Sequence, residues 1–154
     1  MRLLSTKHSS FKGLKDDEHS FSDTNIILGD NGAGKTSLIE AIYTSLLGTP
    51  INSFAKANKD LSRNSEGPFV SESILLNPQG LKVKQSFLST KTSKKLMSND
   101  EKITIREAFL CTPISLIDCN IEKIATESPQ YRRRLIDRSV FHVEQKHAES
   151  YKKL

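Results

Sequence analysis

One stretch decides the fold, Gly29-Asp30-Asn31-Gly32-Ala33-Gly34-Lys35-Thr36, which fits the pattern G-x-x-x-x-G-K-[ST] at every fixed position. Before it, Asn25-Ile26-Ile27-Leu28 is a short apolar run that predicts a buried strand. After it, apolar residues recur at helical spacing over 37–47. Strand, loop and helix therefore follow one another in the order that a phosphate-binding loop requires.

The residue types in this stretch suit the binding of a nucleotide together with magnesium. Its glycines allow backbone angles that turn successive N–H groups toward an anion, and the following helix adds its positive end. Lys35 supplies a cation for the terminal phosphates, and the hydroxyl of Thr36 is placed to ligate Mg²⁺. The residues that we expect to bind the nucleotide are Gly29, Asp30, Asn31, Gly32, Ala33, Gly34, Lys35, Thr36 and Ser37. The alternative is a glycine-rich turn that only leads into an ordinary helix.

Length and composition indicate a globular chain. Its 154 residues suit one domain with a core, and 36% of them are hydrophobic and 27% charged. No apolar run approaches the ~20 residues that cross a bilayer, and the N-terminus lacks the apolar segment of a secretory signal. We therefore expect a cytoplasmic protein with no membrane association. Cys111 and Cys119 stand too far apart from other ligand types for a zinc site, and we expect both to be reduced thiols.

The formal net charge of +5 favours an anionic partner without specifying one. Basic residues cluster in the middle of the chain and near its end: Lys82, Lys84, Lys91, Lys94, Lys95, Lys102 and Arg106, then Arg132, Arg133, Arg134 and Arg138. Lys94, Lys95, Arg132 and Arg133 are the candidates for contact with DNA or with another lobe. The alternative for the lysines is a solvated charged face, and for the arginines an ion pair of Arg133 with Asp137.

The remaining pattern predicts strands on both sides of the phosphate-loop helix. Residues 2–11 and 19–22 suggest short strands, with His8 and His19 at the surface. Gly48 is expected to cap the helix, and a long surface loop should follow over 49–67. Residues 69–76 and 81–88, separated by Asn77-Pro78-Gln79-Gly80, predict a hairpin, with a further turn at Ser98-Asn99-Asp100.

Short elements are predicted in the last third of the chain. Residues 105–110 and 120–126 suggest short helices, and Ile114-Ser115-Leu116-Ile117 suggests a buried strand beside the phosphate-loop strand. Ser128 as the N-cap and Pro129 at the first position predict a helix that extends to 144. We expect residues 1–127 to form a nucleotide-binding lobe and 128–154 to begin a helical lobe.

Three separated segments resemble one known class of proteins. Residues 31–43, with N-G-x-G-K-[ST] running into E-A-I, resemble the phosphate loop of ABC-type ATPase heads in chromosome-maintenance and recombination proteins. Residues 128–137, followed by Val140-Phe141-His142, resemble the P-x-x-R-R-x-x-[LI]-D signature of the bacterial RecF family. Phe11-Lys12-Gly13-Leu14 takes the place of that family's F-R-N segment, with Lys12 where arginine is usual. Asp118-Cys119-Asn120 likewise stands where the family has a Pro-acid pair.

The resemblance implies an α/β fold, a P-loop ATPase head of the ABC/SMC type with a mixed sheet around the phosphate-loop helix and the start of a helical lobe. It also implies ATP and Mg²⁺ as cofactors, an ATP-dependent homodimer, recombination mediator proteins as partners, and binding to single-stranded and gapped DNA in recombinational repair, replication and the SOS response.

The resemblance covers only the first part of the longer RecF family. The family's signature loop and its acidic Walker B strand end have no counterpart in this sequence, so we expect an N-terminal portion that does not hydrolyse ATP alone. One alternative is a truncated nucleotide-binding fragment without activity of its own. Another is an unrelated phosphate-loop enzyme such as a small-molecule kinase, which would need an acceptor pocket and an arginine-rich lid.

Overall fold

The computed structural model describes residues 1–51, 61–63, 67–117 and 129 of the chain. The chain divides into two compact units, Met1–Ala108 and Phe109–Leu154. The elements in chain order are β1 (Arg2–Ser9), β2 (Asp17–Ser20), α1 (Lys35–Leu47), β3 (Phe69–Leu76), β4 (Lys82–Ser89), β5 (Lys94–Ser98), β6 (Glu101–Lys102) and α2 (Ile105–Cys111).

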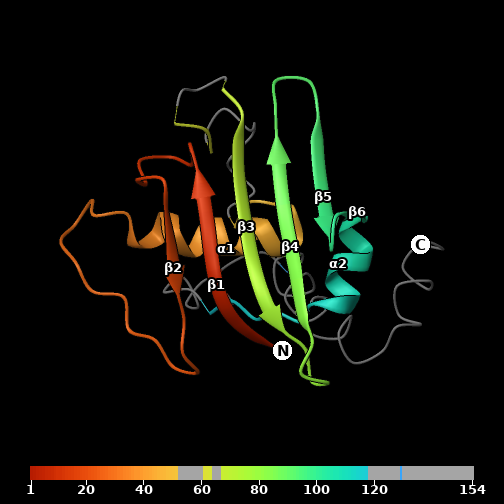
Figure 1. The fold of residues 1–154 in the computed structure, drawn as a ribbon. Helices are drawn as coiled ribbons and strands as arrows, with labels where there is room; N and C mark the ends of the chain where they lie inside the picture. Colours follow the sequence, from red (N-terminus) through yellow and green to blue (C-terminus); the bar gives the residue numbers. More distant parts are fainter. Residues whose placement is uncertain (52–60, 64–66, 118–128, 130–154) are drawn as a thin grey trace. The chain divides into compact units, whose positions relative to one another are not determined.

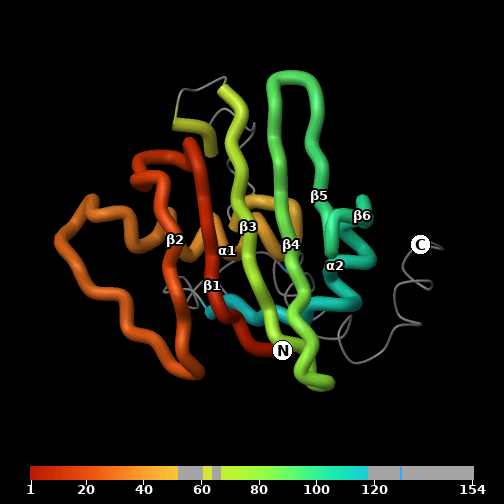
Figure 2. Tube along the Cα trace, viewed as in Figure 1, coloured from red at the N-terminus to blue at the C-terminus, as the bar shows by residue number. Residues whose placement is uncertain are grey.

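The described strands form one antiparallel sheet in the order β2-β1-β3-β4-β5-β6. Helix α1 packs against β3 and β4 and crosses behind the strands in Figure 1. Figure 2 shows in the same view that the chain passes from β2 through a long excursion before it enters α1. The sheet and α1 therefore form two layers, with the phosphate-loop helix covering one face of the sheet.

Strand β3 shows how the two faces of the sheet differ. Phe69, Ser71, Ser73 and Leu75 are buried and alternate with half-buried residues. The hydroxyl of Ser71 donates to the carbonyl oxygen of Ala41 in α1 at 2.7 Å. Because side chains alternate along a strand, the buried set faces α1 and the intervening residues face away from it. We call the face turned away from α1 the open face.

The predicted hairpin is confirmed. Strands β3 and β4 pair in register from Phe69 opposite Ser89 to Leu76 opposite Lys82. In the connecting turn the side-chain oxygen of Asn77 accepts the backbone N–H of Gln79 at 3.0 Å, and Gly80 takes a positive φ of 80°. Asn and Gly are suited to this turn because one caps it through its side chain and the other tolerates the left-handed region.

Helix α1 ends as its sequence predicts. Gly48 adopts a left-handed conformation with φ 67°, and its backbone N–H donates to the carbonyl oxygen of Thr44. A Cβ on Gly48 would lie 3.1 Å from the side chain of Leu96 in β5, so the site favours glycine by both conformation and space. The helix predicted over 105–110 is also present, as α2.

Two predicted strands are wrong. Residues 25–28 have no strand conformation, and Ile26 and Leu28 are 81% and 85% exposed. Residues 114–117 likewise form no strand, and Ile117 is 82% exposed. A buried strand needs a neighbour with which to exchange hydrogen bonds, and no described strand pairs with either segment.

The prediction that both histidines lie at the surface is wrong for His8. Its side chain is 1% exposed on the α1-facing side of β1, and its ring stacks on that of His19 with centroids 5.4 Å apart. Burial and the neighbouring His19 lower the pKa of His8. Strand β5 was not predicted from the sequence; its residues Lys94–Ser98 pair with β4.

Within the described residues, no helix is long and apolar enough to cross a membrane, and no group of acidic, histidine or cysteine side chains could hold a metal ion. Cys111 is a free, exposed cysteine. The helices predicted over 120–126 and from 128 to 144 fall outside the described residues, apart from helical Pro129.

Candidate nucleotide site

The phosphate loop leads directly into α1, whose N-cap is Gly34 with φ 96° and ψ 8°. Among the described residues no side chain caps this end of the helix, and its first turn contains no acidic residue. The first backbone N–H groups of a helix have no partner within the helix, and the helix dipole places partial positive charge there. This end of α1 is therefore available to an anion.

Two glycines shape the loop. Gly32 has a positive φ of 86°, and the N–H of Ala33 donates to the carbonyl oxygen of Asp30 at 3.2 Å, which closes a tight turn. A Cβ on Gly34 would lie 2.8 Å from Cδ2 of Leu14, so the loop passes close to the segment that follows β1. Both the left-handed backbone and this close approach suit glycine.

Lys35 folds back over the loop. Its Nζ donates to the carbonyl oxygens of Gly29 at 2.6 Å and Asp30 at 2.7 Å. A lysine ammonium has three donors, so these two bonds hold it in place and leave one for a phosphate oxygen.

A depression of about 250 Å³ lies at this end of α1. It is lined by Asn31, Gly32, Gly34, Lys35, Thr36 and Ser37. Drug-sized ligands occupy pockets of roughly 300–1,000 Å³, so this volume suits a phosphate tail better than a whole nucleotide. Of the other predicted residues, Gly29 and Asp30 act through their carbonyl oxygens on Lys35, and Ala33 lies in the turn.

The residues present fit a magnesium ion that accompanies phosphates. Thr36 is exposed at the depression and offers a neutral hydroxyl oxygen, which is a ligand type that Mg²⁺ accepts. Magnesium is commonly held by few protein ligands, with the others supplied by phosphate oxygens and water. Thr36 would hold the ion in that way.

The segment that supports the loop is fixed by an arginine that the sequence did not single out. Arg63 donates to the backbone carbonyls of Lys12 and Leu14, and its side chain pairs with Asp16 at 2.7 Å. The N–H of Ser10 also donates to Asp16, and this bond is the main reason that the pKa of Asp16 is lowered. Arg63 lies in a stretch without apolar periodicity, so no sequence signal pointed to it.

A second link joins this segment to α1. Lys12, which has a positive φ of 43°, forms an ion pair with Glu40, whose side chain is 5% exposed. Glu40 is the glutamate of the E-A-I segment, and its ion pair with Lys12 offsets the cost of burying an acidic side chain among apolar neighbours. The cation of Lys12 is thereby held against the phosphate-loop helix.

The structure places two of the four candidates for DNA contact, on opposite faces of the sheet. Lys94 and Lys95 are both exposed, but they are successive residues of β5 and therefore point to opposite faces of the sheet. Lys94 pairs in register with buried Ser89, and Lys95 pairs with half-buried Leu88. Arg132 and Arg133 lie outside the described residues.

The chain is similar to known proteins over almost its whole length. Residues 10–153 match the AAA domain family. The chain is 29% identical over 149 residues to the DNA replication and repair protein RecF of Rickettsia massiliae, and 30% identical to that of Rickettsia akari. Each match covers 96% of this chain and 41% of the relative, so the chain spans about two fifths of the length of these relatives.

Solved structures agree on the fold. The structure of the recombination mediator protein RecF with ATP in the RecFOR pathway superposes with a TM-score of 0.82 at 21% identity, covering 94% of this chain and 39% of that one. A second RecF structure, with ATPrS, gives 0.81. The predicted α/β head of the ABC/SMC type is therefore confirmed. The match over residues 10–153 places the chain in the AAA domain family, and within it the resemblance to RecF is confirmed.

Proposed function

We propose that the chain binds ATP with Mg²⁺ through residues 29–37, as a RecF-like protein of DNA repair and replication. The observation that carries this proposal is the open N-terminus of α1, which faces a glycine-lined depression beside a lysine fixed in place. The ATP-bound RecF structures with the same fold support the choice of nucleotide.

The chemistry of binding follows from the chain's own groups. Backbone N–H groups of the loop and of the first turn of α1 donate to phosphate oxygens, and the third donor of Lys35 adds a charged hydrogen bond. The hydroxyl of Thr36 binds the magnesium ion, which neutralises part of the phosphate charge.

We propose nucleotide binding, and not turnover, as the activity of this chain alone. Phosphoryl transfer requires a positioned metal and a positioned water in addition to a phosphate cradle. The described residues that line the depression supply an amide, hydroxyls and an ammonium, and no carboxylate is among them.

The wider role in this proposal rests on the resemblance to RecF. It comprises an ATP-dependent homodimer, contact with single-stranded and gapped DNA, recombination mediator proteins as partners, a part in the SOS response, and a cytoplasmic location. The net charge of +5 supports contact with DNA. The alternative is a nucleotide-binding fragment without activity of its own, for which ATP binding would be present and DNA binding absent.

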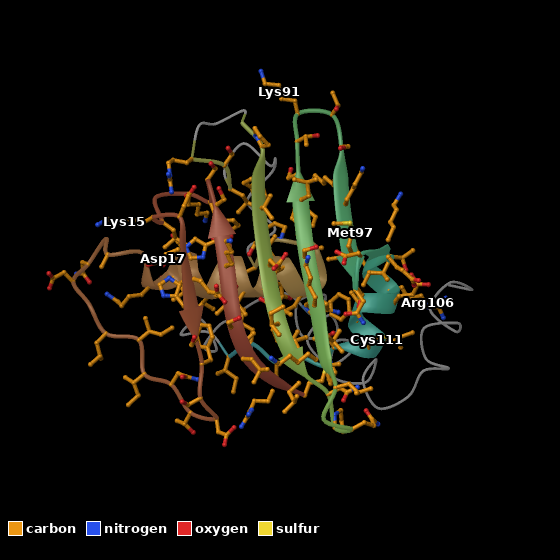
Figure 3. The ribbon with its side chains drawn as sticks, viewed as in Figure 1. Lys15, Asp17, Lys91, Met97, Arg106 and Cys111 are labelled. Atoms are coloured by element: carbon orange, nitrogen blue, oxygen red, sulfur yellow. The ribbon has the colours of Figure 1, made fainter. Side chains whose placement is uncertain are left out.

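Thermal unfolding in the presence of nucleotide tests the proposal. At a concentration of MgATP a hundred times the Kd, binding stabilises the folded state by about 2.7 kcal/mol. For a chain of this size that corresponds to a rise in Tm of about 5–10 °C. Lys35→Ala should abolish the rise, whereas Lys91→Ala, at the tip of the β4–β5 hairpin (Figure 3), should preserve it.

Adenosine separates phosphate recognition from base recognition. It lacks the phosphate tail, so we expect no rise in Tm with adenosine at the same concentration. An equal rise with adenosine and ATP, or an unchanged rise in Lys35→Ala, would contradict binding through the phosphate loop.

A further inference from the structure

The open face of the sheet gathers lysines from strands that are distant in sequence. In β5, buried Leu96 lies on the α1 side of the sheet. Met97, which Figure 3 labels, is the next residue and therefore lies on the open face. Residues that pair across neighbouring strands lie on the same face, so the strand register assigns every strand residue to one face of the sheet. The lysines on the open face are Lys7 of β1, Lys82 and Lys84 of β4, Lys95 of β5 and Lys102 of β6.

Only one of these lysines is neutralised by partners in the described part of the chain. Lys84 pairs with Glu72 at 3.2 Å and with Asp100 at 3.3 Å. On the open face, the exposed lysines that form no ion pair with another described residue are Lys7, Lys82, Lys95 and Lys102. Among the described strand residues, the remaining carboxylate on this face is Glu18, opposite Lys7 in the register. The open face therefore carries a surplus of positive charge.

The spread of these lysines matches a duplex. Neighbouring strands lie about 4.8 Å apart, so β1 and β6, four spacings from each other, are separated by about 19 Å. This distance exceeds the ~12 Å width of the major groove of B-DNA. Lysines toward the two sides of the sheet, such as Lys7 and Lys102, can therefore reach phosphates on both strands of one duplex.

The rest of the open face also favours a duplex over a single strand. Proteins that bind single strands stack bases on aromatic side chains. Among the described residues of the open face there is no aromatic side chain; the apolar ones are aliphatic or methionine, including Val70, Ile74, Leu88 and Met97. Contact through lysine and phosphate needs no base stacking.

We propose that the open face of the sheet binds the phosphate backbone of duplex DNA, with Lys7, Lys82, Lys95 and Lys102 as the contacting cations. This inference rests on the proposed function, because it names the surface for a DNA partner. It also divides the two lysines that sequence alone grouped together, since Lys95 lies on this surface and Lys94 does not.

Fluorescence anisotropy with a labelled duplex tests the assignment on the full chain with MgATP. Lys95→Ala should weaken binding about two- to fivefold, as expected for an exposed charge contact. It should also reduce the slope of log affinity against log salt by about 0.9, the value for one phosphate contact. Lys94→Ala removes the same charge from the adjacent position on the opposite face and should leave both quantities unchanged.

A variant with alanine at Lys7, Lys82, Lys95 and Lys102 should reduce the salt slope by about 3.6. Its rise in Tm with MgATP should stay at the wild-type value, which excludes misfolding as the cause. Equal effects of Lys94→Ala and Lys95→Ala, or tighter binding of a single strand of the same length, would overturn the proposal while DNA binding itself stands. Absence of duplex binding by the wild-type chain would overturn it together with the DNA part of the proposed function.

Discussion

Replacement of Gly34 by alanine should destabilise the protein, and the structure gives the size of the effect. The φ of 96° lies in the left-handed region, where a residue with a Cβ costs about 1–2 kcal/mol. The new Cβ would lie 2.8 Å from Cδ2 of Leu14. This atom is the end of a flexible side chain, so Leu14 can rotate at a cost of about 0.5–1.5 kcal/mol. The total is a loss of about 1.5–3.5 kcal/mol in the free energy of unfolding.

Gly13→Ala is the matched control in the same region. Gly13 is exposed, its φ lies outside the left-handed region, and no heavy atom of the described residues lies within 4 Å of a Cβ placed on it. The same substitution there should be neutral or stabilise by about 0.4–1 kcal/mol, because alanine restricts the unfolded chain. Urea denaturation followed by far-UV circular dichroism measures both variants. If Gly34→Ala and Gly13→Ala differ by less than about 0.5 kcal/mol, the deduced loop geometry is wrong.

Two further predictions concern buried ionisable groups. Burial and His19 lower the pKa of His8 in the folded state. The contribution of His8 to the stability of the folded state is therefore complete above pH 6.5 and is lost as the pH falls through the folded pKa. Between pH 7.5 and 5.5 the free energy of unfolding should therefore fall less in His8→Gln than in the wild type, by at most about 1.4 kcal/mol per pH unit. Denaturation at the two pH values measures this, and equal falls in both proteins would contradict it. Glu40→Gln should lower the free energy of unfolding by about 1–3 kcal/mol, because it leaves the Lys12 ammonium without its partner. Adding Lys12→Met to that variant should recover part of this loss in urea denaturation. Strictly additive effects of the two substitutions would argue against the ion pair.

Local sequence rules were sufficient where local interactions determine the structure. The β3–β4 hairpin depends on a turn with Asn77 and Gly80, and the end of α1 depends on Gly48. Each of these residues acts through its own backbone conformation or a bond to a near neighbour in the chain. The phosphate loop is of the same kind, because its glycines and Lys35 bond within the loop itself.

The predictions that were wrong concern residues whose structure depends on partners distant in the sequence. The apolar run over 25–28 reads as a buried strand, but burial of a strand requires a neighbour, and no described strand pairs with this segment. The surface position predicted for His8 rested on its being a lone histidine, whereas the buried positions of β1 are Thr6 and His8. Apolar periodicity does not identify the buried face of a strand when the buried residues are polar. The role of Arg63 is not visible in the local sequence either, since this residue acts on a segment 47 to 51 residues away.

The polar contacts between α1 and the sheet explain how strands can fix the direction of the phosphate loop. Ser71 donates to the carbonyl oxygen of Ala41, and one turn farther along α1 the hydroxyls of Ser45 and Ser73 lie 2.6 Å apart. Apolar contacts have no direction, but hydrogen bonds have preferred lengths and angles, so two of them one turn apart set both the rotation and the axial position of the helix. The N–H groups at the start of α1 then point in a direction that β3 determines. Because unpaired hydroxyls are costly in a buried interface, a shifted register of α1 would lose these bonds at both positions at once.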